Sequence, residues 1–222
     1  PLGKWYTTIY DNPGKGHLMF VERPLPKVKI GRPRALVYGI GVNDAPYSIS
    51  YTDISGKEHR CPFYSRWRSL IQRVADPKFQ EKYPHYKGCT IEPDWVYFTR
   101  FRSWMEKQDW EGKDLDKDLR YQGNKHYGPN TCLFIRQELN KLLCLRQNGR
   151  GTLPLGVTTT TIRGKKYITA FCSFYAKTKN LGYFATVEEA AAAYKKAKLE
   201  YVKELADSES NPLIKEALLR LF

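Results

Sequence analysis

Long apolar segments are missing from this sequence. In its 222 residues no run approaches the roughly 18 apolar residues that a membrane-spanning helix needs, and the start does not resemble a secretory signal. Pro1-Leu2-Gly3 resembles what protease removal of a tag leaves behind. We expect a soluble, cytoplasmic protein with no membrane partner and no small-molecule cofactor.

Cysteine is scarce and lacks the spacing of a metal site. No Cys-x-x-Cys pair is present, which argues against a disulfide framework and against structural zinc. The pattern predicts small buried thiols in a reducing compartment. The five cysteines are Cys61, Cys89, Cys132, Cys144 and Cys172.

Acidic residues are also in short supply. Lys and Arg total 37 against 23 Asp and Glu, so the formal net charge is +14 and the pI is near 9.5. A hydrophobic content of 41% excludes wholesale disorder. An excess of positive charge usually meets a polyanion, and nucleic acid is the leading candidate partner.

Residues 1–40 are basic, contain several prolines and show little periodicity, which indicates an arm. Gly31-Arg32-Pro33 resembles the core of an AT-hook, which implies insertion into an A·T-rich minor groove. A solvated basic linker is the alternative. The expected DNA contacts of this arm are Lys29, Arg32 and Arg34.

Residues 41–147 are expected to form a second domain, with a polar break after it. Apolar residues recur at helical spacing over 63–74 and leave arginines on the remaining surface, which predicts an amphipathic helix. A second helix is expected over 93–107, and both aromatic stripes are expected to pack in the core. His59 and His85 are expected at the surface because they lack ligand spacing.

The stretch from Leu115 to Asn140 has the pattern of a strand, a loop, a second strand and a short helix. A hairpin followed by a helix can bring one carboxylate and one amide together. Such oxygens suit a hard cation such as Mg²⁺ or Mn²⁺, whose shell is completed by water and phosphate.

This segment resembles the HNH (His-Me finger) nucleases of bacteriophages and mobile introns, over roughly Gly41 to Leu145. The resemblance implies a ββα-metal module in which Asp116 and Asn140 bind the metal and Asn130 holds the loop that orients the general base. The landmarks that carry it are Tyr86-Lys87-Gly88-Cys89, Trp95-Val96-Tyr97-Phe98, Leu115-Asp116 and Asn130-Thr131-Cys132.

Lys117 stands where that family has its namesake histidine. A lysine ammonium is charged at neutral pH and is a poor general base. Either Lys117 stabilises charge developing on the phosphate while another group takes the proton, or His126 reaches into the site. A turn carboxylate at Asp116 and an ordinary polar helix residue at Asn140 are the alternatives to metal binding.

Residues 155–186 change to a period of two, which predicts strands. Gly164 and the cluster Thr178-Lys179-Asn180 supply turns, so three antiparallel strands are expected. Thr186-Val187-Glu188-Glu189 fits a capping box and begins a helix that packs behind the sheet. A final short helix is expected to follow Asn211.

Charge is divided sharply within this C-terminal part. Residues 151–186 contain five basic residues and no acid, whereas residues 187–222 contain six basic and seven acidic residues. The sheet therefore carries the positive field, and a ribbon of this kind fits a DNA major groove. The expected DNA contacts are Arg163, Lys165, Lys166, Tyr167, Thr169, Phe171, Lys177 and Lys179.

Residues 152–222 also resemble the plant ethylene-response-factor (APETALA-type) DNA-binding domain, over about 50 residues. The resemblance implies a three-stranded sheet lying in the major groove with a helix packed behind it. Its landmarks are Leu155-Gly156-Val157, the strand Lys166 to Phe171, Leu181-Gly182-Tyr183-Phe184, and Thr186-x-Glu188-Glu189-Ala190-Ala191-x-x-Tyr194.

Together these features predict an α+β protein with a central ββα-metal module and flanking helices, followed by a three-stranded antiparallel sheet packed on a helix. The preferred hypothesis is a double-stranded DNA-binding protein of the HNH homing-endonuclease type, which nicks or cleaves DNA with Mg²⁺ or Mn²⁺ in a phage-infected bacterial cell. The alternative is a phage DNA-binding regulator or anti-defence protein without turnover, which Lys117 favours. A third hypothesis is a module that binds an acidic protein. The oligomeric state stays open.

Overall fold

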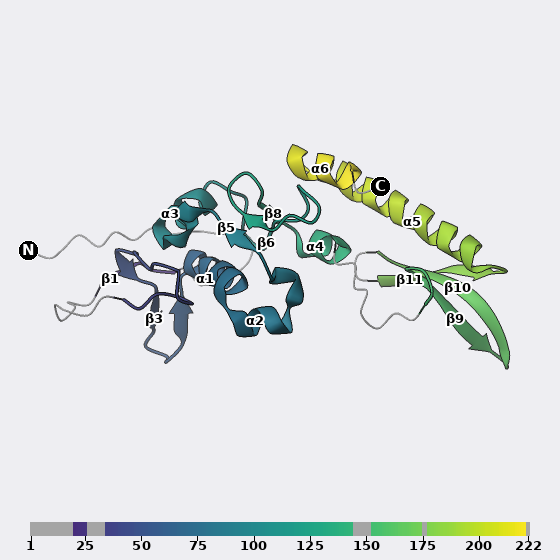
Figure 1. Cartoon of the computed structure of the whole chain (residues 1–222), viewed down its shortest axis with the longest axis horizontal. Helices are drawn as coiled ribbons and strands as arrows, with labels where there is room; N and C mark the ends of the chain where they lie inside the picture. The colour runs from purple at the N-terminus through teal and green to yellow at the C-terminus, as the bar shows by residue number, and fades with distance from the viewer. Residues whose placement is uncertain (1–19, 26–33, 144–151, 175–176, 221–222) are drawn as a thin grey trace, which may run out of the picture. The chain divides into compact units, whose positions relative to one another are not determined.

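The computed structural model describes residues 20–25, 34–143, 152–174 and 177–220, with side chains as far as 140 in the second range. It confirms the α+β class, with small sheets among helices (Figure 1). The contacts divide the chain into two compact units. Unit 1 holds the described residues up to Glu111 together with Gly123–Cys132, and unit 2 holds Gly112–Gln122 and the described residues from Leu133 onward.

Unit 1 combines short strand pairs with helices. Its strands are β1 (Arg23–Pro24), β2 (Tyr47–Ser48), β3 (Ser50–Thr52), β4 (Glu58–Arg60), β5 (Thr90–Ile91) and β7 (His126–Tyr127). The pairs β1–β2 and β3–β4 are antiparallel, and β5–β7 is parallel. Its helices are α1 (Pro62–Ala75), α2 (Pro77–Lys82) and α3 (Phe98–Met105), with short 3₁₀ turns at Pro84–Tyr86 and Pro93–Val96.

The expected helix over 63–74 is confirmed by α1, and its aromatic stripe lies in the core. Trp67 is fully buried, and its indole Nε1 donates a hydrogen bond to the carbonyl of Trp95 at 2.8 Å. Phe98 packs on this ring with centroids 5.6 Å apart. Gly41 lies against this ring, and a Cβ there would be 3.0 Å from it, so a larger residue would require the Trp67 ring to shift.

The expected helix over 93–107 is interrupted at Tyr97, whose backbone is extended. The amide of Val42 donates to the carbonyl of Val96, and the amide of Phe98 donates to the carbonyl of Val42. A distant segment therefore takes the hydrogen bonds that would have continued the helix.

Part of the expected arm is joined to unit 1. Phe20 is buried and its ring lies 5.5 Å from that of Tyr51. Glu22 forms a 2.7 Å ion pair with Arg102, which leaves the charges of both side chains largely out of water. The segment from Phe20 to Leu25 thus belongs to the folded unit, while residues 26–33 lie outside the described residues.

The β3–β4 hairpin shows that the expectation of a surface position for His59 is wrong. His59 is only 9% exposed, stacks on Tyr51, and places Nε2 at 2.7 Å from Asp53 Oδ2. The other Asp53 oxygen accepts hydrogen bonds from the amides of Ser55 and Lys57. These hydrogen bonds hold the turn between β3 and β4, and the contact with Asp53 keeps the His59 imidazole buried.

In unit 2, a two-stranded pair and a helix share an apolar core with the C-terminal helices. β6 (Asp114–Asp116) pairs antiparallel with β8 (Leu133–Ile135), and α4 (Gln137–Leu143) follows. Leu139 on α4 is fully buried in the same cluster as residues of α5 (Val187–Asp207) and α6 (Pro212–Leu219). The other members of this cluster, which we call the shared core, are Leu119, Leu133, Ile135, Tyr201, Val202, Leu205, Ala206, Ile214, Ala217 and Leu218.

The shared core changes the expected domain division. β6, β8 and α4 lie within the expected domain over 41–147, but they belong to unit 2, where residues of β8 and α4 pack in one core with the C-terminal helices. Arg136, between β8 and α4, adds a polar link because its Nη2 lies 3.6 Å from Glu209, whose side chain is 7% exposed.

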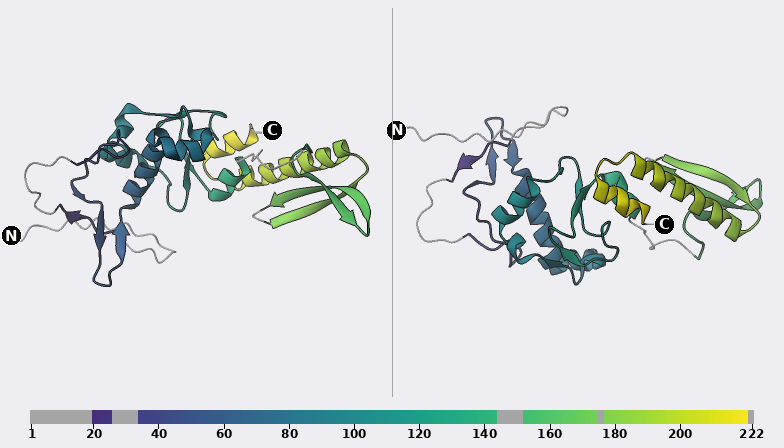
Figure 2. Two further views of the ribbon diagram at one scale, coloured as in Figure 1. Left: turned by 60° about the horizontal axis from the view of Figure 1, so that its bottom comes forward. Right: turned by 90° about the horizontal axis from the view of Figure 1, so that it is seen from above.

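The expected three-stranded antiparallel sheet is confirmed in unit 2, and its strand order is β11-β10-β9. Its strands are β9 (Val157–Ile162), β10 (Lys165–Phe174) and β11 (Lys177–Phe184). Helix α5 lies along one face of this sheet (Figures 1 and 2). The capping box at Thr186 and Glu189 is confirmed, and so is the cap of α6 at Asn211.

Gly156 explains one of the sequence landmarks. Its φ is +79°, and a Cβ at this position would lie 2.0 Å from the ring of Tyr194 on α5. The backbone leading into β9 therefore sits directly against the helix, and no side chain fits between them.

The turns of the sheet were only partly predicted. Arg163 and Gly164 have positive φ and form the two-residue turn between β9 and β10. The expected turn at Thr178-Lys179-Asn180 is wrong, because these residues belong to β11 and pair with Ser173, Cys172 and Phe171.

Four of the five cysteines lie in the described part of the chain, and all four are free and buried, as expected; they are Cys61, Cys89, Cys132 and Cys172. Cys144 lies outside the described residues. None of the helices in the described part of the chain combines the length and the apolar character that crossing a bilayer requires.

The shared core predicts that shortening the Leu139 side chain on α4 destabilises the C-terminal helices. We expect Leu139→Ala to lower the free energy of unfolding by about 2–5 kcal/mol through loss of apolar contacts and the cavity left behind. Urea denaturation measures this loss, and amide hydrogen exchange should accelerate in α5 and α6. Leu213→Ala is the control, because Leu213 is 40% exposed on α6. Unchanged exchange in α5 and α6 would contradict the shared core.

The β3–β4 turn predicts a pH effect. Hydrogen bonds from Ser55 and His59 lower the pKa of Asp53 well below its usual 3.8. A lowered folded-state pKa stabilises the protein above the unfolded value, and this stability is lost as the pH falls below 3.8. We expect Asp53→Asn to be less stable than the parent at neutral pH, with the difference shrinking in acid.

Urea denaturation of the two proteins between neutral pH and strong acid measures that difference. Glu58→Gln removes a negative charge from the same hairpin and separates net charge from the hydrogen-bonded carboxylate. A difference between parent and Asp53→Asn that stays constant with pH would contradict the assignment.

Candidate nucleic-acid interface and metal site

The sheet of unit 2 has one face covered by α5 and one face turned away from it. Ile168 and Ala170 on β10 contact the α5 cluster. The residues alternating with them therefore stand on the other face, which we call the outer face. Its members by strand register are Thr158, Thr160, Ile162, Lys165, Tyr167, Thr169, Phe171, Ser173, Thr178, Asn180 and Tyr183.

Side-chain contacts confirm this face. The Thr169 hydroxyl donates to Thr160 Oγ1 at 3.1 Å, and the rings of Tyr167 and Tyr183 meet edge to face at 5.4 Å. These residues come from different strands, so the contacts hold the outer face in one arrangement. The expected face with Tyr167, Thr169 and Phe171 together is therefore confirmed. Thr169 is fully buried beneath its neighbours.

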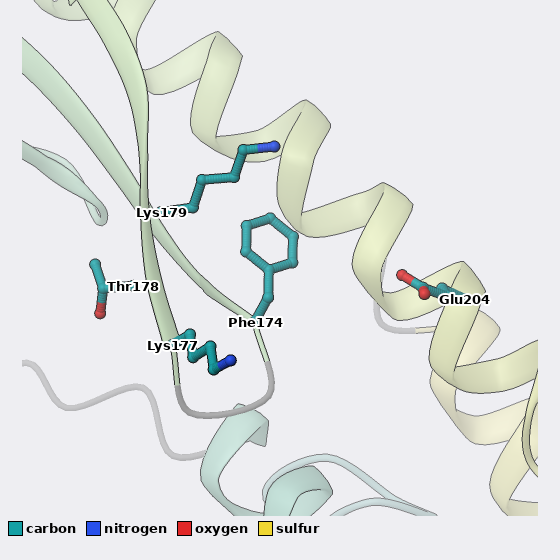
Figure 3. Close-up of a pocket in the computed structure, with 5 residues that line it drawn as sticks. All are labelled: Phe174, Lys177, Thr178, Lys179 and Glu204. Atoms are coloured by element: carbon teal, nitrogen blue, oxygen red, sulfur yellow. The ribbon is translucent and has the colours of Figure 1, made fainter.

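The expected cationic contacts do not all share this face. Lys165 stands on the outer face, with Nζ 5.7 Å from the Tyr167 ring. Lys177 and Lys179 pair with Phe174 and Cys172, so they stand on the α5 side of the edge strand β11. Figure 3 shows both lysines on the side of α5, whereas Thr178 points the other way.

Lys177 and Lys179 line an open hollow of about 510 Å³ between the end of the sheet and α5. Phe174 forms part of its wall, and Glu204 of α5 stands at the other side (Figure 3). Lys166 alternates onto the same side of the sheet as Ile168, near the β9–β10 turn that holds Arg163.

The sheet cations keep their charge exposed to solvent. All five side chains are exposed, and within the described ranges none lies at ion-pair distance from an acid. No acidic residue occurs between positions 151 and 186 to offset them. The five are Arg163, Lys165, Lys166, Lys177 and Lys179.

In the expected arm, Lys29 and Arg32 lie outside the described residues. Arg34 is described, and its guanidinium Nη1 donates to the carbonyls of Asn43 and Ala45 at 2.8 and 2.9 Å. The side chain of Arg34 thus joins its own segment to the backbone at Asn43 and Ala45 in unit 1.

Asp116 lies at the end of β6 and is buried. Its Oδ1 accepts hydrogen bonds from the amides of Asp118 and Leu119, at 3.0 and 2.7 Å. Burial raises the pKa of this carboxyl above its ordinary value, and the amide of Leu119 opposes that shift. One oxygen therefore shapes the turn, as the alternative interpretation from the sequence expected.

Asn140 on α4 is directed at β6. Its Nδ2 donates to Asp114 Oδ2 at 3.4 Å. Asp114 alternates with Leu115 and shares a side of the strand with Asp116. Sequence reasoning missed Asp114, although the Asp-x-Asp spacing in a strand was a signal for it.

Lys117 is also buried and makes a 2.6 Å ion pair with Asp118. The Lys117 ammonium donates a hydrogen bond to the carboxylate of its neighbour at this distance. A general base needs a free lone pair, so this arrangement fits the charge-stabilising role better than proton abstraction.

His126 lies on β7 in unit 1, whereas Asp116, Lys117 and Asn140 belong to unit 2. Its Nδ1 is 3.0 Å from Thr90 Oγ1, and its Nε2 is 3.6 Å from Glu92. Both ring nitrogens therefore have partners within unit 1.

The loop after β7 is shaped by neighbours of Asn130. Asn130 is exposed in the turn. The Thr131 hydroxyl donates to the carbonyl of His126 at 2.8 Å, and Asn124 Nδ2 donates to the same carbonyl at 2.7 Å. The loop-holding role implied for Asn130 is thus carried by bonds from Thr131 and Asn124.

Within the described residues, no group of three or more His, Cys, Asp and Glu side chains is gathered in a way that could hold a metal ion. The carboxylates of Asp114 and Asp116 share a side of β6, and the amide nitrogen of Asn140 donates to Asp114. Carboxylate oxygens are hard ligands, which suit Mg²⁺ or Mn²⁺.

Comparison of the chain with protein-family models, curated proteins and solved structures finds no significant match.

Proposed function

We propose that the protein binds double-stranded DNA through the sheet β9–β11 of unit 2. The observation that carries this proposal is the set of five exposed sheet cations, none paired with an acid within the described residues, in a segment without acidic residues. Unpaired cations on a fixed scaffold attract a polyanion and release its counterions on binding.

The arrangement of the cations supports a groove-binding geometry. The outer face offers hydroxyls and aromatic rings, while Arg163 and Lys166 lie at the turn end of the sheet. Lys177 and Lys179 lie along the edge strand β11. A ribbon inserted in the major groove would place its face against base edges and its borders against phosphates.

Metal-dependent nicking or cleavage is a second candidate function, and the hard oxygens of Asp114, Asp116 and Asn140 favour it. These three residues would hold a Mg²⁺ or Mn²⁺ ion. When bound, the ion would neutralise negative charge on a scissile phosphate. The resemblance to HNH nucleases points to the same pair, Asp116 and Asn140.

A regulator or anti-defence protein that binds DNA without cutting it is the competing form of this proposal. The ion pair between Lys117 and Asp118 favours it, because no free base occupies the position of the family's histidine. Binding of an acidic protein would use the same cations, but it does not explain why the outer face is rich in hydroxyl groups.

We expect DNA affinity to fall steeply with salt. Contact with about six phosphates gives a slope of log K against log salt near −5, and contact with an acidic protein gives a shallower one. Replacing both Lys165 and Lys166 with alanine should reduce the slope by about two and weaken binding to all sequences alike.

Titration of a fluorescent duplex at several salt concentrations measures these slopes. Replacing Lys195 and Lys196 with alanine is the matched control, because this change removes the same charge from exposed positions on α5. Equal loss of slope in the two double variants would mean that net charge, and not the sheet, governs binding.

Supercoiled plasmid incubated with Mg²⁺ or Mn²⁺ distinguishes the two forms of the proposal. If the protein is a nuclease, it relaxes or linearises the plasmid, whereas a regulator leaves it intact. We expect Asp116→Asn and Asn140→Ala to abolish cutting and to keep DNA affinity within about twofold, since neither removes a phosphate contact. Asp116→Asn retains an acceptor for the amides of Asp118 and Leu119.

Asp207→Asn on α5 is the control for loss of a carboxylate, because that side chain is 78% exposed. Cutting that persists in both Asp116→Asn and Asn140→Ala would overturn the metal assignment while leaving the binding proposal in place.

A further inference from the structure

The outer face of the sheet is unusually rich in threonine. Thr158 and Thr169 face each other across β9 and β10, and Thr160 stands opposite Tyr167 in the next row. On the other side of β10, Tyr183 is opposite Thr169 and Asn180 is opposite Phe171. Methyl groups, hydroxyls and aromatic rings therefore make up the centre of this face.

Groups that commonly read guanine are missing from that centre. The commonest guanine contact is a bidentate Arg or Lys. In the described part of the sheet, Arg163 lies in the turn and Lys165 lies at the turn end of β10, beyond the threonine rows. The centre of the outer face has no cation to offer O6 and N7 of guanine.

Asn180 is restricted as an adenine reader. Its Oδ1 accepts a hydrogen bond from the amide of Gly182 at 2.9 Å, at the irregularity in the β10–β11 pairing. Bidentate reading of adenine needs both the oxygen and the nitrogen of an amide. The bond to Gly182 fixes the orientation of the Asn180 amide, which restricts how its oxygen and nitrogen can turn together toward one base.

Thymine presents the base-edge group that best complements this surface. Its C5-methyl projects into the major groove, where the methyl of Thr and the ring of Phe make apolar contact with it. Thr158 is exposed and Thr160 is half-buried, so both can be reached from outside. Thr160 also receives the hydroxyl of Thr169, which leaves its own O–H to donate.

We infer that the outer face of the β9–β11 sheet recognises thymine-containing DNA by apolar contact of Thr158, Thr160 and Phe171 with thymine C5-methyl groups in the major groove. This inference rests on the proposed DNA binding and adds the base feature that is read. The sheet cations supply affinity for any duplex, and the methyl contacts supply discrimination between duplexes.

Removal of the methyl group from the DNA alone tests the inference. The intact protein is titrated with an A·T-rich duplex and with the same duplex in which every thymidine is replaced by deoxyuridine. We expect the deoxyuridine duplex to bind about threefold to fivefold more weakly for each methyl contact, as expected for exposing one buried methyl group. Replacing cytosine by 5-methylcytosine in a G·C-rich duplex should strengthen binding, because this change adds a methyl group at the same place in the groove.

Matched protein variants locate the contact. Replacing Thr158 and Thr160 with serine removes two methyl groups and keeps both hydroxyls, so the preference for thymidine over deoxyuridine should fall to the part that Phe171 supplies. Replacing Thr159 and Thr161 with serine is the control, because these exposed residues alternate onto the other side of the same strand. This control should keep the preference of the parent.

Each outcome has one meaning. Equal affinity of the parent for the thymidine and deoxyuridine duplexes overturns methyl reading and leaves DNA binding intact. A preference as large in the Thr158→Ser, Thr160→Ser variant as in the parent overturns the assignment to these threonines. Absence of binding to every duplex at low salt overturns the proposed function together with the inference.

Discussion

Burial of apolar side chains between α4 and the two C-terminal helices is the interaction on which the rest of unit 2 depends. A two-stranded pair is marginal on its own in water, and so is a helix of seven residues such as α4. Leu139 and Ile135 contribute to a core that α5 and α6 complete. The candidate metal residues and the basic sheet therefore belong to one folded unit, and stabilising one supports the other.

The sequence predicted correctly those structural elements that depend on interactions between residues close together in the chain. The capping box of Thr186 and Glu189 fixed the start of α5, since a hydroxyl and a carboxylate satisfy nearby backbone amides there. Period two placed Tyr167, Thr169 and Phe171 on one face because a pleated strand alternates its side chains. The charge division between sheet and helix likewise needed only the order of residues.

The features that sequence reasoning missed depend on distant partners. Tyr97 interrupts a helix because the backbone of Val42 takes the hydrogen bonds, and no periodicity around Tyr97 reveals that competition. His59 is buried because the turn at Asp53 receives its ring. The hydrogen bond from Asn140 to Asp114 forms because the fold brings α4 beside β6, across 26 residues of sequence. Each case joins segments that the sequence keeps apart.

The two ends of helix α5 pack on different parts of unit 2, so the rotation of one end relative to the other about the helix axis is fixed. Its first turns pack Ala190 and Tyr194 on the sheet, and its last turns pack Val202 and Leu205 in the shared core. At 1.5 Å per residue its 21 residues span about 30 Å as a single rod. Adding or deleting one residue midway would rotate one packing face by about 100° relative to the other, whereas a change of seven residues would nearly restore alignment. The exposed positions of this helix can therefore be substituted with less effect on packing than the insertion or deletion of one residue.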